Sequence, residues 1–161
     1  MRKSRAVDFA MMLDSFIPEL VRAARNQESR RLSRYALTLP QFFALSCLEE
    51  GPRMMKELGE DLGLTLGTVT GIVDRLARAG LAERFSDEKD RRIVRARLTP
   101  RGEELMGQIH RERVEWLSRQ LQEMEEDDIA RFAELLSKYG MRLASGNEQD
   151  DREGQEGIDV P

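Results

Sequence analysis

The chain has 161 residues, a formal net charge of −4, one cysteine and one histidine. A single cysteine excludes an intrachain disulfide and a multi-thiolate metal site, and a single histidine leaves little for acid–base catalysis, so we expect neither an enzyme nor a cofactor. Since no apolar run approaches the roughly 18 residues of a membrane span and no signal-like segment is visible, we expect a cytoplasmic protein.

The charge is distributed unevenly along the chain. Residues 74–101 hold 9 basic and 5 acidic residues, whereas residues 102–161 hold 7 basic and 16 acidic ones. A basic segment within an acidic chain is where a phosphate-binding surface is expected. The last stretch, 145–161, is polar and nearly free of large apolar residues, which predicts a disordered acidic tail.

The first predicted element is a long helix from Arg5 to Arg31, with a bend at Pro18. Basic residues near its end fit a solvated helix terminus, with contact to a DNA backbone as the alternative. The apolar residues at helical spacing are Phe9, Leu13, Phe16, Ile17, Leu20, Val21 and Ala24.

The next predicted helix opens at Leu39-Pro40 and ends at Gly51-Pro52. Cys47 lies in it beside acidic residues, a setting that does not activate a thiol, so we expect a buried or unreactive side chain. The predicted apolar face consists of Phe42, Phe43, Leu45 and Leu48.

Two short helices around a tight turn are predicted next. Leu58 and Leu62 repeat at i, i+4 on the first helix, which stops at Gly63. Thr65 caps the second, and Gly80 ends it. The apolar stripe of the second helix is Val69, Ile72, Val73, Leu76 and Ala79, and its opposite face carries Gly67, Thr68, Gly71 and Arg75.

An antiparallel pair of strands follows, at Leu81 to Phe85 and Arg92 to Leu98. The segment between them is too polar to be buried, so the pair predicts a wing that projects from the two helices. In the second strand the inward residues are Val94, Ala96 and Leu98, and the outward ones are Ile93, Arg95 and Arg97.

Two helices are predicted after the wing. Thr99 and Pro100 form the N-cap and first turn of a long helix, and the acidic cluster Glu125 to Asp128 suits the start of the last one. With the first helix they carry more apolar surface than a small winged domain covers, so pairing with a second copy is expected. Their stripes are Leu105, Ile109, Trp116, Leu117, Leu121 and Met124, then Ile129, Phe132, Leu135, Leu136, Tyr139 and Leu143.

Five short motifs occur in a specific order: Leu62-Gly63-Leu64-Thr65, Val73-Asp74-Arg75-Leu76, Gly80-Leu81, Asp90-Arg91-Arg92 and Leu98-Thr99-Pro100-Arg101-Gly102. Together they resemble the MarR family of bacterial transcription regulators. The resemblance implies a mainly α fold with a small β-hairpin wing. It assigns residues 1–34 to an N-terminal dimerisation helix, 35–99 to a winged helix-turn-helix DNA-binding region and 100–144 to C-terminal dimerisation helices.

The resemblance also implies a homodimeric regulator, expected to be a repressor, that binds a pseudo-palindromic operator in double-stranded DNA. The second helix of the pair would enter the major groove and Arg92 the minor groove, with Asp90 helping to hold it. Gly67 and Gly71 stand where relatives often carry longer polar side chains, so weak direct base readout is expected. The residues assigned to DNA are Thr65, Leu66, Gly67, Thr68, Gly71 and Arg75 on the helix and Lys89, Asp90, Arg91 and Arg92 on the wing.

Regulation by a small aromatic or phenolic acid is a further implication of the resemblance, and His110 is expected to face solvent. Two alternatives stay open: a winged-helix protein-interaction module without a DNA target, and a DNA-binding regulator that senses oxidation through Cys47. The residues assigned to an effector cleft are Phe9, Leu13, Phe42, Phe43, Met54 and Met55.

Overall fold

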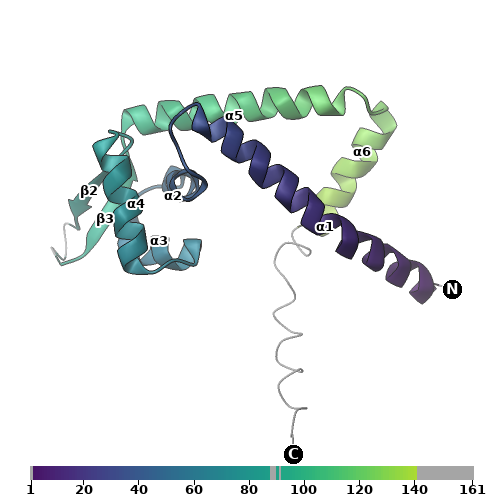
Figure 1. The fold of residues 1–161 in the computed structure, drawn as a ribbon, viewed down its shortest axis with the longest axis horizontal. Helices are drawn as coiled ribbons and strands as arrows, with labels where there is room; N and C mark the ends of the chain where they lie inside the picture. Colours follow the sequence, from purple (N-terminus) through teal and green to yellow (C-terminus); the bar gives the residue numbers. More distant parts are fainter. Residues whose placement is uncertain (1, 88–89, 91, 141–161) are drawn as a thin grey trace, which may run out of the picture. The chain divides into compact units, whose positions relative to one another are not determined.

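The computed structural model describes residues 2–87, 90 and 92–140 (Figure 1). The helices are α1 (Arg2–Ser33), α2 (Leu39–Glu49), α3 (Met55–Leu62), α4 (Leu66–Arg78), α5 (Pro100–Leu121) and α6 (Glu126–Leu135), which continues as a π-helical turn at Leu136–Gly140. The strands are β1 (Arg53–Met54), β2 (Ala82–Ser86) and β3 (Val94–Leu98). Lys89, Arg91, Leu143 and the predicted acidic tail lie outside the described residues.

The chain divides into two compact units, Met1–Ile109 and His110–Pro161, and the boundary falls within α5. The first unit contains the predicted helix-turn-helix and wing. The boundaries predicted at residues 34, 99 and 144 separate dimerisation from DNA binding rather than compact units, and they stay predictions.

Helices α3 and α4 form the predicted helix-turn-helix. Helix α3 ends at Gly63, whose φ of 61° lies in the left-handed region that glycine adopts at little cost. The turn is tight, since Leu64 N–H donates to Gly59 O at 2.8 Å and a Cβ on Gly59 would lie 3.0 Å from Leu64 O. Thr65 Oγ1 then accepts a hydrogen bond from Thr68 N–H at 3.3 Å, which confirms Thr65 as the N-cap of α4.

The apolar stripe of α4 is buried in the core of the first unit. Val69, Val73 and Leu76 are fully buried, as the spacing predicts. Ala79 is exposed, so the prediction that it continues the stripe is wrong: the helix ends at Arg78 and the chain turns at Gly80, whose φ is 71°. The remaining core residues are Leu32, Leu37, Phe42, Ala44, Leu45, Leu48, Met55, Leu58, Ile72, Leu81, Ala82, Ala96, Leu98, Met106 and Ile109.

Helix α2 buries a narrower face than the sequence predicts. Phe42, Leu45 and Leu48 are buried, but Phe43 is 50% exposed, so its assignment to the apolar face is wrong for the described chain. Adjacent residues of a helix point about 100° apart, and only one of two successive phenylalanines can face this core. The two rings still contact each other, with centroids 5.7 Å apart.

The wing is a three-stranded antiparallel sheet in the order β1-β3-β2. Strand β3 pairs along its whole length with β2, from Ala82 opposite Leu98 to Ser86 opposite Val94. The edge strand β1 was not predicted, because two residues carry no pattern until they pair with β3. The alternation predicted for β3 is confirmed over its second half, where Ala96 and Leu98 are buried and Arg97 is exposed, whereas Val94 and Arg95 are both half-buried.

Thr99 joins the wing to α5. Its Oγ1 donates to Gly80 O at 2.7 Å and accepts from Gly102 N–H at 3.1 Å, so it caps α5 as predicted and ties it to the end of α4. A Cβ on Gly102 would lie 2.0 Å from Leu81 O, which makes glycine necessary at this crossing. This contact sets the position of the first turn of α5 against the start of the wing.

Candidate nucleic-acid interface

The residues assigned to the major groove come together on the first two turns of α4. Leu66, Gly67 and Thr68 are exposed, and Gly71 is half-buried one turn further on. Arg75 is exposed two turns after Gly67 and lies in the last turn of the helix. The predicted helix contacts therefore lie around the side of α4 that faces away from the core, with Leu66 at one edge and Thr68 and Arg75 at the other.

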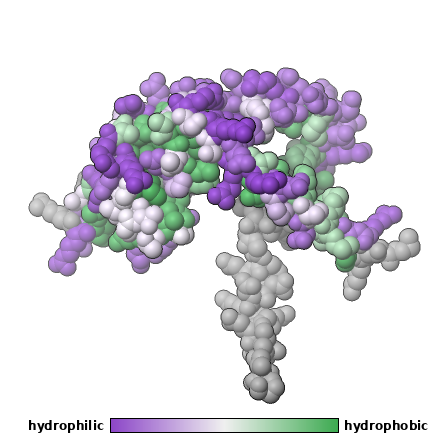
Figure 2. All heavy atoms as spheres, in the orientation of Figure 1, coloured by the Kyte–Doolittle hydropathy of each residue, from purple (hydrophilic) through white to green (hydrophobic). Residues whose placement is uncertain are grey.

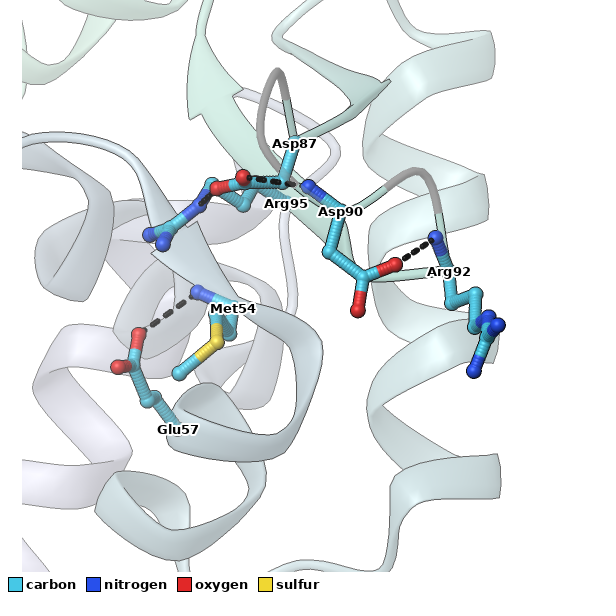
Figure 3. Close-up of polar contacts among 6 residues, drawn as sticks. All are labelled: Met54, Glu57, Asp87, Asp90, Arg92 and Arg95. Carbon is cyan, nitrogen blue, oxygen red and sulfur yellow. Dashed lines mark hydrogen bonds and ion pairs between the residues drawn. The ribbon is translucent and has the colours of Figure 1, made fainter.

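The hydroxyl groups on this face bond within the helix. Thr65 Oγ1 and Thr68 Oγ1 lie 2.9 Å apart, and Thr70 Oγ1 donates to Leu66 O at 2.8 Å. Nearby, the carboxylate of Glu57 accepts a hydrogen bond from Met54 N–H at 2.8 Å and closes the start of α3 (Figure 3). These polar groups of the helix-turn-helix therefore form hydrogen bonds within the motif itself.

The wing turn is organised by two aspartates. Asp90 Oδ1 accepts a hydrogen bond from Arg92 N–H at 3.0 Å, and Asp87 Oδ1 accepts one from Asp90 N–H at 3.3 Å. Asp90 therefore holds Arg92 through its backbone, whereas Figure 3 shows the guanidinium of Arg92 pointing away from both carboxylates. The backbone of Arg92 is therefore bonded to Asp90, and its side chain is exposed.

Three other arginines of the basic segment are paired with carboxylates. Arg95 Nε lies 2.6 Å from Asp87 Oδ2, and the side chain of Asp87 is only 17% exposed. The two other pairs are Arg97 with Glu83 at 2.6 Å and Arg84 with Asp74 at 2.7 Å. These pairs reduce the basic footprint that the sequence predicts.

Asp87, Glu83 and Asp74 were not predicted to be part of the site. One of them could have been expected once the register of the two strands was known, because that register places Glu83 opposite Arg97. Asp74 of α4 pairs with Arg84 of β2, and no pattern of neighbouring residues predicts such a contact.

A cavity of about 360 Å³ lies between the start of α3, the recognition face of α4 and the wing. Its lining includes two of the residues assigned to an effector cleft, Met54 and Met55, together with Leu66 and Arg92. Phe9, Leu13, Phe42 and Phe43 are not among the residues that line it. The structure thus places the two methionines beside the residues assigned to DNA.

Cys47 is half-buried in α2. Burial raises the pKa of its thiol, the negative charges of Asp61 and Glu50 act in the same direction, and Arg53 acts against them. A raised pKa keeps the thiol protonated at neutral pH, and the thiolate is the reactive form. His110 is exposed, as predicted.

Among the described residues, no helix is both long and apolar enough to span a membrane. Large hydrophobic side chains are exposed on several of the helices, and some of them are neighbours along the chain. On α1 they are Val7, Phe9, Met11, Met12, Phe16, Ile17, Leu20 and Val21, and on α6 and the π-helical turn they are Phe132, Leu135, Leu136 and Tyr139.

Comparisons with known proteins agree on one family. The MarR family model matches residues 37–94. The protein YsmB of Bacillus subtilis (strain 168), described as an uncharacterized HTH-type transcriptional regulator, is 36% identical over 108 residues, which are 66% of this chain and 74% of that protein. A MarR family protein from Bacillus stearothermophilus is similar in structure, with a TM-score of 0.74 and 30% identity over 85% of this chain and 97% of that one.

The crystal structure of Streptococcus pneumoniae FabT in complex with DNA shares the fold, with a TM-score of 0.70 and 23% identity over 84% of this chain and 98% of that one. The glycine-closed helix-turn-helix, the three-stranded wing and the relatives together identify the protein: the chain belongs to the MarR family and is a DNA-binding transcription regulator.

Proposed function

We propose that the protein represses transcription by binding a pseudo-palindromic operator as a homodimer. Each α4 enters a major groove and each wing reaches an adjacent minor groove. The observation that carries this proposal is the exposed start of α4 together with the exposed Arg92, on a wing in which Arg84, Arg95 and Arg97 are paired with carboxylates.

The shape and charge of α4 suit the major groove. The groove of B-DNA admits an α-helix, and the N-terminal residues of a recognition helix reach the base edges. Leu66, Gly67 and Thr68 are short or apolar and place no carboxylate at this end. Arg75 and Arg78, in the last turn, are suited to phosphates on either side of the groove.

The wing supports contact with the minor groove through Arg92. Its guanidinium is exposed, whereas Arg95 is committed to Asp87 in a short ion pair. An arginine that enters a narrow minor groove responds to the stronger negative potential of A·T-rich DNA. Asp90 stabilises the turn that presents Arg92 without neutralising its side chain, which agrees with the role assigned to it.

The exposed apolar side chains of α1 and α6 support the homodimer. Figure 2 shows hydrophobic surface on the N-terminal part of α1, where Phe9, Met11 and Met12 are each more than half exposed. Such surface is costly in water at about 25 cal/mol per Å², and a second copy of the chain supplies an equivalent surface to cover it. A two-fold axis would also space two α4 helices by roughly 34 Å, one turn of DNA.

A small aromatic or phenolic acid is the proposed effector. It would release DNA by binding more tightly to an arrangement of the dimer that does not fit the operator. Of the residues assigned to it, Phe42 and Met55 are buried in the core, although Met55 also lines the cavity beside α4, and Phe9, Leu13, Phe43 and Met54 are exposed or half-buried.

Fluorescence anisotropy on duplexes tiled from the DNA upstream of the gene tests the proposal. Saturable binding to one duplex, with log affinity falling linearly with log salt, is expected for the wild-type protein. Arg92→Ala and Arg75→Ala should each reduce the slope by about 2 per dimer, since each removes one positive charge per protomer from the DNA-facing surface.

Arg119→Ala is the matched control, because it removes an exposed arginine from α5, outside the winged helix. It should leave the salt slope unchanged. Equal binding to every duplex, with no difference among the three variants, would contradict the proposed binding mode.

A further inference from the structure

Leu66 is an unusual residue on the recognition face. Its side chain is 56% exposed, although the other large apolar residues of α4 are buried in the core. It is the first residue of the helix, and helical side chains lean toward the N-terminus, so it lies at the tip that the proposed binding mode inserts furthest into DNA. An exposed leucine at this position has no role in the core of the described unit.

The hydroxyl groups around Leu66 have few donor protons left. Thr70 Oγ1 uses its one proton on Leu66 O. Thr65 and Thr68 share a hydrogen bond between their hydroxyls, which uses one proton of the two, and Thr65 Oγ1 also accepts from Thr68 N–H. Three hydroxyls therefore keep a single donor proton for a base edge, so this turn reads base acceptors poorly, although its oxygens can still accept hydrogen bonds.

The glycines beside Leu66 increase its reach. A Cβ on Gly67 or Gly71 would have no described heavy atom within 4 Å outside the backbone of its own helix, so neither glycine is required by packing. Without those two Cβ atoms, the backbone of α4 can come closer to the base edges. Leu66 is then the one large apolar side chain of α4 that is exposed beside this backbone.

In the major groove, thymine differs from cytosine by a C5-methyl group and presents a surface that an apolar side chain can cover. We infer that Leu66 selects bases through contact with the 5-methyl group of thymine, and that it is a specificity-determining residue of this regulator. The inference rests on the proposed insertion of α4 into the major groove. It names apolar contact, rather than hydrogen bonding, as the means by which α4 reads sequence.

Replacing thymine by uracil removes only the methyl group and keeps the base pair. The test therefore measures affinity by anisotropy on the operator duplex and on copies with one thymine at a time replaced by uracil. Three proteins are compared: the wild type, Leu66→Ala and Arg92→Ala. Arg92→Ala is the matched control, because it weakens binding through the wing and should leave any difference between thymine and uracil intact.

The wild type should bind about fourfold more weakly when uracil replaces one or two particular thymines per half-site, the effect expected for one buried methyl group. Leu66→Ala should bind both duplexes equally at those positions, whereas Arg92→Ala should keep the fourfold difference. Saturable wild-type binding that ignores every uracil, or a difference that survives in Leu66→Ala, overturns the role of Leu66 alone. Absence of saturable binding to any duplex overturns the proposed function and this inference with it.

Discussion

Substitution of Gly71 by alanine should raise the stability of the protein and lower its affinity for DNA. Gly71 lies in the interior of α4, and a Cβ there would meet no described heavy atom within 4 Å beyond the backbone of its own helix. Glycine within a helix costs about 1 kcal/mol relative to alanine, because it loses more backbone entropy on folding. The free protein should therefore gain about 1 kcal/mol of unfolding free energy per chain from Gly71→Ala.

The same methyl group would lie between α4 and the base edges in the proposed complex. If it holds the helix away from the groove, affinity should fall by about tenfold, or 1.4 kcal/mol. Chemical denaturation at fixed protein concentration measures the first effect, and anisotropy on the operator measures the second. The opposite signs separate a role in binding from a role in folding.

Gly102→Ala is the matched control, because its Cβ would lie 2.0 Å from the backbone oxygen of Leu81. It should destabilise the protein by about 2 kcal/mol, as overpacked sites do. A Gly71→Ala protein that is more stable and binds the operator as tightly as the wild type would refute the close approach of α4 to DNA. A less stable one would refute the helix argument.

Three further results are expected. Phe16→Glu, in the exposed apolar part of α1, should shift the dimer toward monomer in light scattering and weaken operator binding; an unchanged dimer would exclude this surface from the interface. Asp87→Ala should cost about 1 kcal/mol in denaturant unfolding and weaken operator binding, since it removes the ion pair with Arg95 and a support of the wing turn; an unaltered affinity would show that the turn forms without it. Alkylation of Cys47 at pH 7.5 should be slower in the folded protein than in urea, and its rate should rise with pH above neutrality, because burial raises the pKa of the thiol. Alkylation of the folded protein as fast as in urea, or release of DNA by mild peroxide, would favour oxidation sensing.

The helix-turn-helix could be predicted because its signals are local. Gly63 and Gly80 end helices through their positive φ, and Thr65 and Thr99 cap the helices that follow. Each of these preferences belongs to one residue and its neighbours along the chain. The family motifs lie at the same positions, so fold class and function could both be predicted before any coordinates.

The predictions that failed depend on neighbours distant in sequence or on the end of a helix. Phe42 and Phe43 are identical side chains at adjacent positions of α2. Only packing against the core decides that Phe42 is buried and Phe43 is not. Strand β1 has only two residues and is recognised as a strand because it pairs with β3. Ala79 fits the stripe but lies just beyond the last helical residue.

At the DNA interface, too, some properties could be predicted from the sequence and others depended on folding. Residue types and their order along the chain were enough to identify a recognition helix, a basic wing and a family, since those are properties of sequence. Which arginines remain available for DNA depended on the folded arrangement, because Asp74, Glu83 and Asp87 pair with Arg84, Arg97 and Arg95, which lie 8 or more residues away along the chain. The exposure of Leu66 was likewise settled by packing, because burial depends on what the rest of the chain covers.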